Sequence, residues 1–356
     1  MDILAFEVLS LSVLSKNLNN LRNLLLNNIM RKIFIAFVTA LMFAFGACGQ
    51  NATNSSIAEK FDGNNETLNV LRDSLQAVAD RCPGEVGIAV ITDCGDTLLV
   101  NNQTKYPLMS VFKLHQAIAL CRLFEQTGQS LDSVVAIPRS NLNPDTWSPM
   151  LKDFQGSVIS IPVRELLRYS LTQSDNNASN YMFERMQSVA DVDSVMAGII
   201  PRESFRLRYT EADMWDNHSL SYDNCSSPLG AALLIKRLFT ESIMGADDVR
   251  FVRTTLQECR TGTDRIVAPL AALPGVRVAH KTGSGFRSPE GILSAHNDVG
   301  QVLLPGGRYY TLAILVKDFH GSEKEAAAVM ADISTRVYTA LNKHNMQSRK
   351  QDCPES

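Results

Sequence analysis

Three short groups of residues could together carry out acyl transfer. They are Ser110-Val111-Phe112-Lys113, Ser174-Asp175-Asn176 and Lys281-Thr282-Gly283. Together they supply a hydroxyl nucleophile, a neighbouring amine, a second serine that can move a proton, and a cation for a carboxylated substrate. Each group alone is common by chance, so it is their joint occurrence in this order that indicates an acyl-enzyme site.

Ser110 and Lys113 are three positions apart at the start of an apolar stripe with helical spacing. One helical turn therefore places both side chains on the same face. A serine hydroxyl is a poor nucleophile until a base accepts its proton. Lys113 can help if burial and a second cation lower its pKa, and Lys281 is the expected cation. The alternative is a Ser-x-x-Lys sequence that occurs on this helix by chance.

The second group lies in a polar stretch between two helical patterns. We expect Ser174 to give a proton to the leaving group and Asn176 to hydrogen-bond a substrate amide. The alternative is a helix N-cap, because Ser, Asp and Asn all cap well. Both interpretations can hold at once.

The third group ends a run rich in strand-forming residues. Lys281 and Thr282 can bind a substrate carboxylate, and Gly283 would let substrate approach the strand backbone closely. The N–H groups of Ser284 and Ser110 would then form an oxyanion hole. The alternative is a strand that runs into a glycine turn.

The elements that must position these groups follow from hydrophobic periodicity. Strand patterns near both ends of the chain most simply join one antiparallel sheet, with helices gathered beside it in an α+β fold of two lobes. The expected helices are 67–82, one from Ser110, 163–171, 178–189, 228–239 and 323–341, and the expected strands are 86–92, 97–101, 276–281, 294–303 and 309–316.

Composition limits the classes of function. The chain has 356 residues, 45% hydrophobic, and a net charge of −3, which argues against wholesale disorder and gives no basic surplus for nucleic acid. No HExxH or CxxC spacing is present, so we predict no metal and no cofactor. Six cysteines remain besides Cys48, and spacing leaves any disulfide pairing open.

Residues 30–48 have the layout of a secretory signal peptide: a short basic region, an apolar run over 33–45, and small residues before Cys48. The apolar run is short for a bilayer span, which favours cleavage over an uncleaved anchor. Cys48 ends the run where a lipidated cysteine would stand. We therefore expect export to the periplasm, with simple cleavage and a lipid anchor on Cys48 as alternatives.

The rest of the chain divides around one catalytic domain. Residues 1–29 are an upstream extension outside the fold, because we expect translation to begin at Met30. A polar stretch at 49–65 is a flexible linker. The domain itself covers 66–345 and is followed by a polar tail at 346–356.

The sequence around the three groups resembles that of the class A serine β-lactamases over roughly residues 66–345. The stretches Tyr-Pro-Leu-Met-Ser-Val-Phe-Lys, Thr-Trp-Ser-Pro-Met-Leu-Lys-Asp and Ala-His-Lys-Thr-Gly-Ser-Gly are most similar to the CfxA-type extended-spectrum cephalosporinases. The resemblance implies a multi-layer α/β/α fold of the serine β-lactamase and D,D-peptidase kind, with a five-stranded antiparallel sheet and an all-helical lobe. It also implies a monomer that acts on small β-lactam molecules.

The resemblance further implies a glutamate that activates water to hydrolyse the acyl-enzyme. Glu211 stands in the expected interval, and Asp213 is its nearest competitor. This loop departs from the common class A pattern, because Trp215, Tyr209 and Asn224 stand where asparagine, arginine and aspartate are usual. We therefore expect a loop that lacks its customary ion pair, as in the extended-spectrum branch.

Three supporting roles also rest on the resemblance. Asn180 would orient Glu211, and Trp147 would form an aromatic wall of the cleft, with ordinary packing as its alternative. Arg265 would reach the substrate carboxylate through two N–H groups, and a solvated surface arginine is its alternative.

The expected activity is hydrolysis of the β-lactam amide, with cephalosporins preferred, through acylation of Ser110 and deacylation by Glu211. One alternative is a penicillin-binding D,D-peptidase with the same three motifs. The other is a β-lactam sensor that acylates without turnover.

Overall fold

The computed structural model describes residues 66–351, with side chains to residue 342. The predicted extension, signal peptide, linker and Cys48 lie outside the described residues, as does Cys353. Everything described below belongs to one compact unit.

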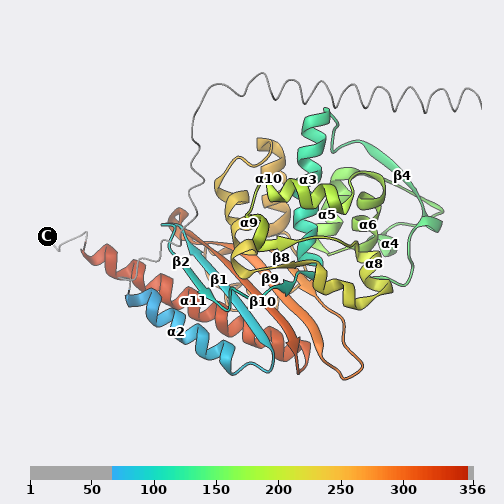
Figure 1. Ribbon diagram of the computed structural model, residues 1–356. Coiled ribbons are helices and arrows are strands. Elements are labelled where there is room, and N and C mark those ends of the chain that lie inside the picture. Colours follow the sequence, from blue (N-terminus) through green and yellow to red (C-terminus); the bar gives the residue numbers. More distant parts are fainter. Residues whose placement is uncertain (1–65, 352–356) are drawn as a thin grey trace, which may run out of the picture. The chain divides into compact units, whose positions relative to one another are not determined.

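A five-stranded antiparallel sheet forms the centre of the unit (Figure 1). Its strands are β1 (Glu85–Thr92), β2 (Thr97–Val100), β8 (Arg277–Ser284), β9 (Leu293–Leu303) and β10 (Tyr309–Phe319). The order is β2-β1-β10-β9-β8, so the last strand in the chain pairs with the first. In this register Ala89 lies opposite Ala313, and Lys281 lies opposite Val299 on the edge strand β8.

Both faces of the sheet are covered, which makes three layers. Helices α2 (Glu66–Asp80) and α11 (Glu323–Gln351) lie along one face (Figure 1). Ile88 and Ile314 pack there against Leu75 and Ile333. The opposite face, with Ala89 and Ala313, packs against the helical lobe. Because successive strand residues point to opposite faces, burial on both explains why β1 and β10 are almost continuously apolar.

The helical lobe is formed by the middle of the chain. It contains α3 (Phe112–Thr127), α4 (Pro149–Asp153), α5 (Val163–Thr172), α6 (Asn176–Arg185), α7 (Val189–Ala197), α8 (Glu211–Asp216), α9 (Pro228–Thr240) and α10 (Ala246–Gln257). Short strands β4 (Val134–Pro138) and β5 (Val158–Pro162) form a hairpin at its edge, and β3 (Tyr106–Pro107), β6 (Phe205–Arg206) and β7 (Cys225–Ser226) form a small second sheet.

The α+β class, the five-stranded sheet and the helical lobe are confirmed, and most expected elements are present within a few residues. The helix expected over 178–189 is wrong in extent. It ends at Arg185, because Ser188 and Asp191 form a capping box that starts α7. Helix α11 continues to Gln351, beyond the expected domain end at 345.

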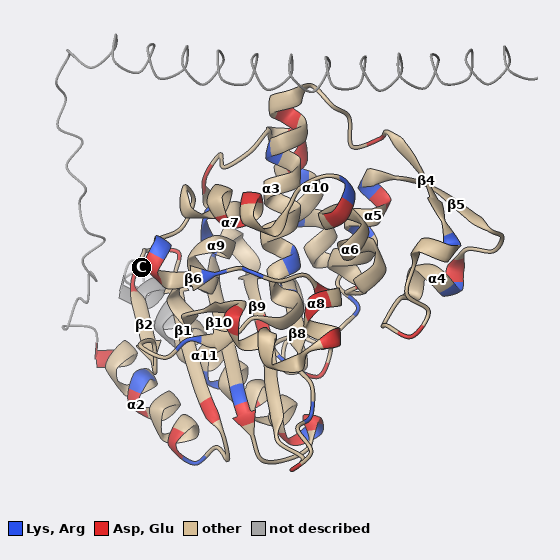
Figure 2. Cartoon of the chain, turned by 45° about the vertical axis from the view of Figure 1, so that its right-hand side comes forward, with Lys and Arg blue, Asp and Glu red and all other residues tan. Residues whose placement is uncertain are grey.

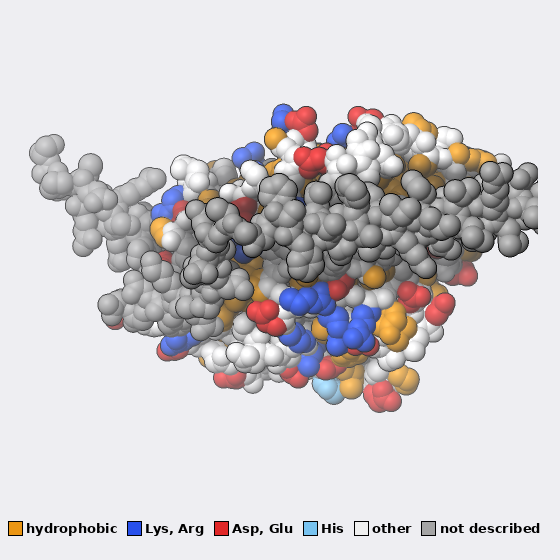
Figure 3. All heavy atoms as spheres, turned by 45° about the horizontal axis from the view of Figure 1, so that its top comes forward, with side chains coloured by type: hydrophobic (Ala, Val, Ile, Leu, Met, Phe, Trp, Pro, Cys, Tyr) orange, Lys and Arg blue, Asp and Glu red, His pale blue; other side chains and the backbone are white. Residues whose placement is uncertain are grey.

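Positions of charged residues occur along the chain in both lobes (Figure 2). On the face seen in Figure 3, basic and acidic groups lie next to one another. No helix within residues 66–351 is long and apolar enough to cross a membrane. That the chain does not bind nucleic acid stays a prediction.

Candidate active site

The nucleophile-bearing turn packs directly on strand β8. Ser110 lies in a 3-10 turn (Met109–Val111) that leads into α3, two residues before the first residue of that helix. Met109 has φ of 47°, a conformation that side chains seldom adopt. A Cβ at Gly283 would collide with the Leu108 carbonyl, so glycine is needed for this packing. Its predicted role in substrate approach stays a prediction.

Lys113 lies at the centre of the site and is fully buried. Its ammonium group donates to Ser110 Oγ at 3.1 Å, to the Ser174 carbonyl at 2.7 Å, and to Asn176 Oδ1 at 2.6 Å. It also forms an ion pair with Glu211 Oε1 at 3.0 Å. Burial lowers the pKa of Lys113, although the Glu211 carboxylate acts in the opposite direction.

Glu211 is the first residue of α8 and is buried. Its Oε1 accepts a hydrogen bond from Ser110 Oγ at 2.7 Å, so one carboxylate contacts both the hydroxyl and the amine. Asp213 is engaged elsewhere: it caps the same helix by accepting from the N–H and the hydroxyl of Thr210, each at 2.8 Å. The geometry therefore favours Glu211 over Asp213 as the base.

Asn180 reaches the same loop. Its Oδ1 accepts from the Ala212 N–H at 3.1 Å, next to Glu211 in the chain. The contact holds the first turn of α8, and it supports the predicted orienting role without touching the Glu211 carboxylate.

Ser174 joins the two lysines. Its Oγ accepts from Lys281 Nζ at 3.0 Å and lies 3.5 Å from Lys113 Nζ. Its φ of 59° is left-handed, which places the hydroxyl in the site instead of on the helix. The capping role falls to Asp175, whose carboxylate accepts from the Ala178 N–H at 2.8 Å. The capping and functional interpretations of this segment are thus divided between neighbouring residues.

Lys281 is buried on β8 and also donates to the Thr282 carbonyl at 2.8 Å. Burial, followed by the charge of Lys113, lowers the pKa of Lys281 to about 7. The charge of Lys113 therefore disfavours protonation of Lys281. The reverse effect, of Lys281 on the pKa of Lys113, stays a prediction. Near neutral pH, Lys281 can therefore exchange a proton with the Ser174 hydroxyl that it contacts.

Arg265 is not a surface arginine, because it is only 6% exposed. Its guanidinium donates to the Asn297 carbonyl at 2.6 Å, the Gly283 carbonyl at 3.3 Å and Ser284 Oγ at 2.7 Å. These bonds hold the end of β8. Contact with a substrate carboxylate stays a prediction for this side chain.

Trp147 is 55% exposed, which argues against the ordinary packing alternative. Its indole N–H donates to the Gln173 carbonyl at 2.8 Å, while its own carbonyl accepts from the Asn176 N–H at 3.0 Å. The ring is thereby fixed beside the Ser174 segment with much of its surface open to solvent.

The loop around Glu211 is held by neutral hydrogen bonds from Asn224, where class A enzymes usually have an ion pair. The buried Asn224 side chain accepts from the N–H groups of Arg208 at 2.7 Å and Tyr209 at 3.0 Å, and donates to the Tyr209 carbonyl at 2.8 Å. The Asn224 carbonyl also accepts from the Leu108 N–H at 2.7 Å, which connects the loop to the nucleophile turn.

Sequence reasoning missed an aromatic cluster beside this loop. Phe286, which follows β8, stacks on His218 with ring centroids 3.7 Å apart, and Trp215 meets it edge-on at 6.4 Å. Trp215 remains 42% exposed. The loop-end position of Phe286 after Lys281-Thr282-Gly283 was the only available signal.

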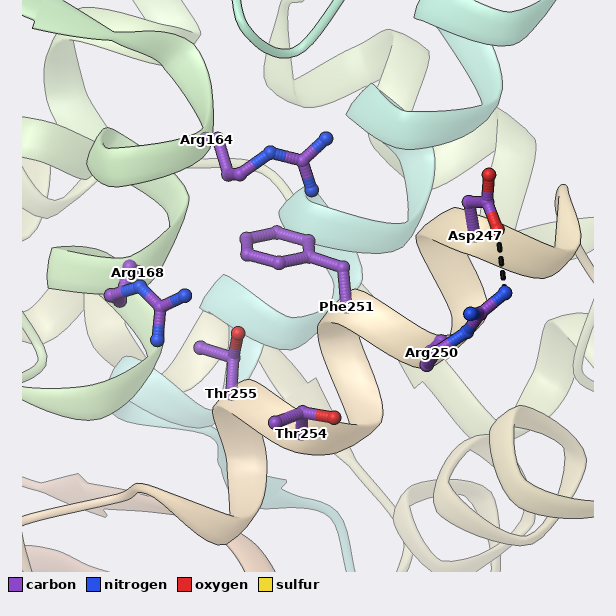
Figure 4. A pocket seen from close by; sticks show the side chains of 7 residues that line it. All are labelled: Arg164, Arg168, Asp247, Arg250, Phe251, Thr254 and Thr255. Carbon is purple, nitrogen blue, oxygen red and sulfur yellow. Dashed lines mark hydrogen bonds and ion pairs between the residues drawn. The ribbon is translucent and has the colours of Figure 1, made fainter.

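A groove on the helical lobe is lined by residues outside the site described above (Figure 4). It has a volume of about 460 Å³ and is lined by Arg164, Arg168, Asp247, Arg250, Phe251, Thr254 and Thr255. Its arginines are already paired: Arg164 with Asp132, Arg168 with Glu258, and Arg250 with Asp247. None of the predicted site residues lines it. Within residues 66–342, no cluster of His, Cys, Asp or Glu could hold a metal ion.

A serine nucleophile, two buried amines and a buried carboxylate at the junction of a sheet and a helical lobe define a serine acyl-transfer enzyme. Comparison with known proteins gives the family. A profile described as "Beta-lactamase enzyme family" matches residues 70–341. A β-lactamase of Phocaeicola vulgatus is 50% identical over 314 residues, which is 88% of this chain and 96% of that protein.

Two further relatives agree. The extended-spectrum β-lactamase PER-1 of Pseudomonas aeruginosa is 30% identical over 87% of this chain and 96% of its own. A class A β-lactamase structure from Bacteroides cellulosilyticus is 31% identical, with a TM-score of 0.73 over 79% of this chain and all of that one. The chain therefore belongs to the β-lactamase enzyme family, as a class A serine β-lactamase that hydrolyses β-lactams.

We predict that the pKa of Lys281 sets the alkaline limit of substrate capture. Above pH 7 the free enzyme loses the Lys281 proton, so kcat/KM for a carboxylated β-lactam should fall by up to about tenfold per pH unit. Lys281→Arg should abolish this fall, because arginine stays protonated. The check is a kcat/KM profile of both proteins from pH 6 to 9. The same decline in both would assign it to another group.

Proposed function

We propose that this β-lactamase works through a covalent Ser110 acyl-enzyme that Glu211-activated water hydrolyses. The observation that carries the proposal is the triangle of Ser110 Oγ, Lys113 Nζ and Glu211 Oε1, whose sides are 3.1, 3.0 and 2.7 Å. A hydroxyl this close to two candidate bases meets the geometric requirement for nucleophile activation.

In the proposed acylation, Ser110 Oγ attacks the β-lactam carbonyl carbon and its proton passes to Lys113, directly or through Glu211. The C–N bond breaks, the ring nitrogen takes a proton from Ser174, and Ser174 regains one from Lys113, which lies 3.5 Å from its hydroxyl. The N–H groups of Ser110 and Ser284 stabilise the oxyanion. Lys281 and Thr282 bind the substrate carboxylate, and Asn176 bonds the amide of the acyl side chain.

In the proposed deacylation, Glu211 takes a proton from a water molecule that attacks the ester carbonyl, and Ser110 leaves with that proton. Burial against Lys113 keeps the carboxylate next to the reacting atoms. Two alternatives, a D,D-peptidase and a sensor, would also be acylated by a β-lactam on this serine. The family assignment favours hydrolysis of the acyl-enzyme over both.

We predict that Glu211→Gln accumulates an adduct on Ser110, because the amide cannot accept the water's proton. Turnover of a chromogenic cephalosporin should fall by about 10²- to 10⁴-fold. Intact-protein mass spectrometry should show the adduct, and Ser110→Ala should show none. Asp213→Asn is the matched control, because its carboxylate caps α8 and should be dispensable for turnover. Rapid turnover by the Glu211 variant would mean that another base works.

We also propose a preference for cephalosporins, with an acyl side-chain pocket shaped by the α8 loop. Two observations support it. Asn224 holds the loop by neutral hydrogen bonds, and the Phe286–His218–Trp215 cluster joins the loop to the segment after β8. PER-1, at 30% identity, is named an extended-spectrum enzyme. A loop braced from this side can keep one open shape for bulky side chains.

Phe286→Ala should therefore lower the ratio of kcat/KM for a bulky cephalosporin to that for a small penicillin. Aromatic pairs contribute about 0.5–1.5 kcal/mol each, which corresponds to about a two- to tenfold change in the ratio. Phe239→Ala, which removes a ring stacked on Arg253 in the helical lobe, is the control and should leave the ratio unchanged. An unchanged ratio in the Phe286 variant would exclude this role.

We further propose that the enzyme acts as a monomer in the periplasm, exported by the signal at residues 30–48. The basic, apolar and small-residue regions of that segment support export. Mass spectrometry of the mature N-terminus should find either lipid-modified Cys48 or a free amine at or after this position. Retention of residues 1–29 would contradict both the start at Met30 and the cleavage.

A further inference from the structure

A second group of reactive side chains, Cys259, His280 and Asp298, lies beside strand β8 and has no part in the proposed mechanism. His280 and Thr282 are two residues apart on β8, so their side chains share one face. The segment that follows α10 crosses this face and brings Cys259 and Thr261 to it. Asp298, on the neighbouring strand β9, completes the group.

The histidine is held between an acid and a thiol. His280 Nδ1 lies 2.8 Å from Asp298 Oδ1, and both side chains are buried. Asp298 is itself fixed, because its Oδ2 accepts from the Ile266 N–H at 3.2 Å. The His280 ring also lies near enough to the Cys259 thiol for each group to shift the pKa of the other. The order acid, imidazole, thiol favours transfer of the thiol proton to the ring.

The surrounding charges agree with that transfer. Burial acts to raise the pKa of Cys259, but the charges of His280 and Lys281 outweigh it and lower the value to about 7. Burial opposes protonation of His280, yet Asp298 and Cys259 raise its pKa to about 10. By contrast, burial raises the pKa of the other cysteines within residues 66–342, which are Cys82, Cys94, Cys121 and Cys225.

The thiol is connected to the substrate-binding strand by two short contacts. Cys259 Sγ lies 3.4 Å from Thr261 Oγ1, and Thr261 Oγ1 lies 2.5 Å from Thr282 Oγ1. The backbone that follows Thr261 packs closely on Thr282, because a Cβ at Gly262 would collide with Thr282 Cγ2. A group added to the sulfur on this side would displace Thr261, and with it the Thr282 hydroxyl.

We propose that Cys259 is a reactive thiolate whose modification by a small disulfide or alkylating electrophile weakens β-lactam binding at Thr282. The thiolate attacks one sulfur of the disulfide, a new S–S bond forms, and the other sulfur leaves as a thiolate. Cys259 is free and half-buried, so the proposal concerns small reagents, and the first experiment below tests whether they reach the sulfur. The effect on activity rests on the proposed carboxylate-binding role of Lys281 and Thr282, whereas the reactivity of the thiol does not.

The first experiment measures reactivity alone. The native enzyme is treated with iodoacetamide from pH 5.5 to 9 and labelling is followed by peptide mapping. Cys259 labelling should rise to a plateau with a midpoint near 7, whereas labelling of the exposed Cys94 should still be increasing at the highest pH. His280→Gln should move the Cys259 midpoint upward and leave Cys94 unchanged. A wild-type midpoint equal to that of Cys94 overturns the proposal.

The second experiment tests the link to binding. Methyl methanethiosulfonate transfers a methylthio group to the thiolate and releases methanesulfinate. In a Cys94→Ser background, KM for a carboxylated cephalosporin should rise at least about tenfold with little change in kcat, and dithiothreitol should restore it. Cys259→Ser should be active and insensitive to the reagent. Complete labelling of Cys259 without a change in KM would refute control of the site, while the adduct on Ser110 separately tests the proposed function.

Discussion

The active site depends on keeping the Lys113 ammonium group inside the protein. A charge in this position would be strongly destabilising without partners, because removing it from water costs several kcal/mol. Asn176 and the Ser174 carbonyl provide two of those partners from one segment, and Glu211 provides the third from another. The same contacts that compensate for burial also bring the hydroxyl of Ser110 between an amine and a carboxylate. The contacts that stabilise the buried Lys113 charge are thus the same contacts that position the Ser110 hydroxyl.

That requirement explains why the loop bearing Glu211 is fastened so closely. Asn224 holds the loop backbone through its side chain and holds Leu108, just before the nucleophile turn, through its carbonyl. A shift of this loop would separate Glu211 from Lys113 and leave a buried cation without its counter-charge. Neutral hydrogen bonds from Asn224 thus hold the loop backbone, and the ion pair that is usual in class A enzymes is not needed for this.

The sequence predicted which residues come together in the site better than it predicted the contacts that hold them in place. Ser110, Lys113, Ser174 and Lys281 were found because acyl transfer requires those residue types near each other, and the structure brings them together. Strands buried on both faces were recognised by their length and apolar character. Contacts that join distant segments, such as Phe286 with His218 or Arg265 with Ser284, leave no periodic signal. Helix α10 was missed, and the break before α7 depends on local capping.

The order of strands in the sheet has a consequence for how the molecule is made. Strand β10 lies between β1 and β9, so the first hairpin of the domain can be completed into a sheet only when residues near 319 are present. Such non-local pairing delays folding, since long loops must close before any contact rewards them. Strands β1 and β2 must therefore keep one apolar edge unpaired until β10 is available. A cell that produces this enzyme has to protect those strands from aggregation for the whole of that interval.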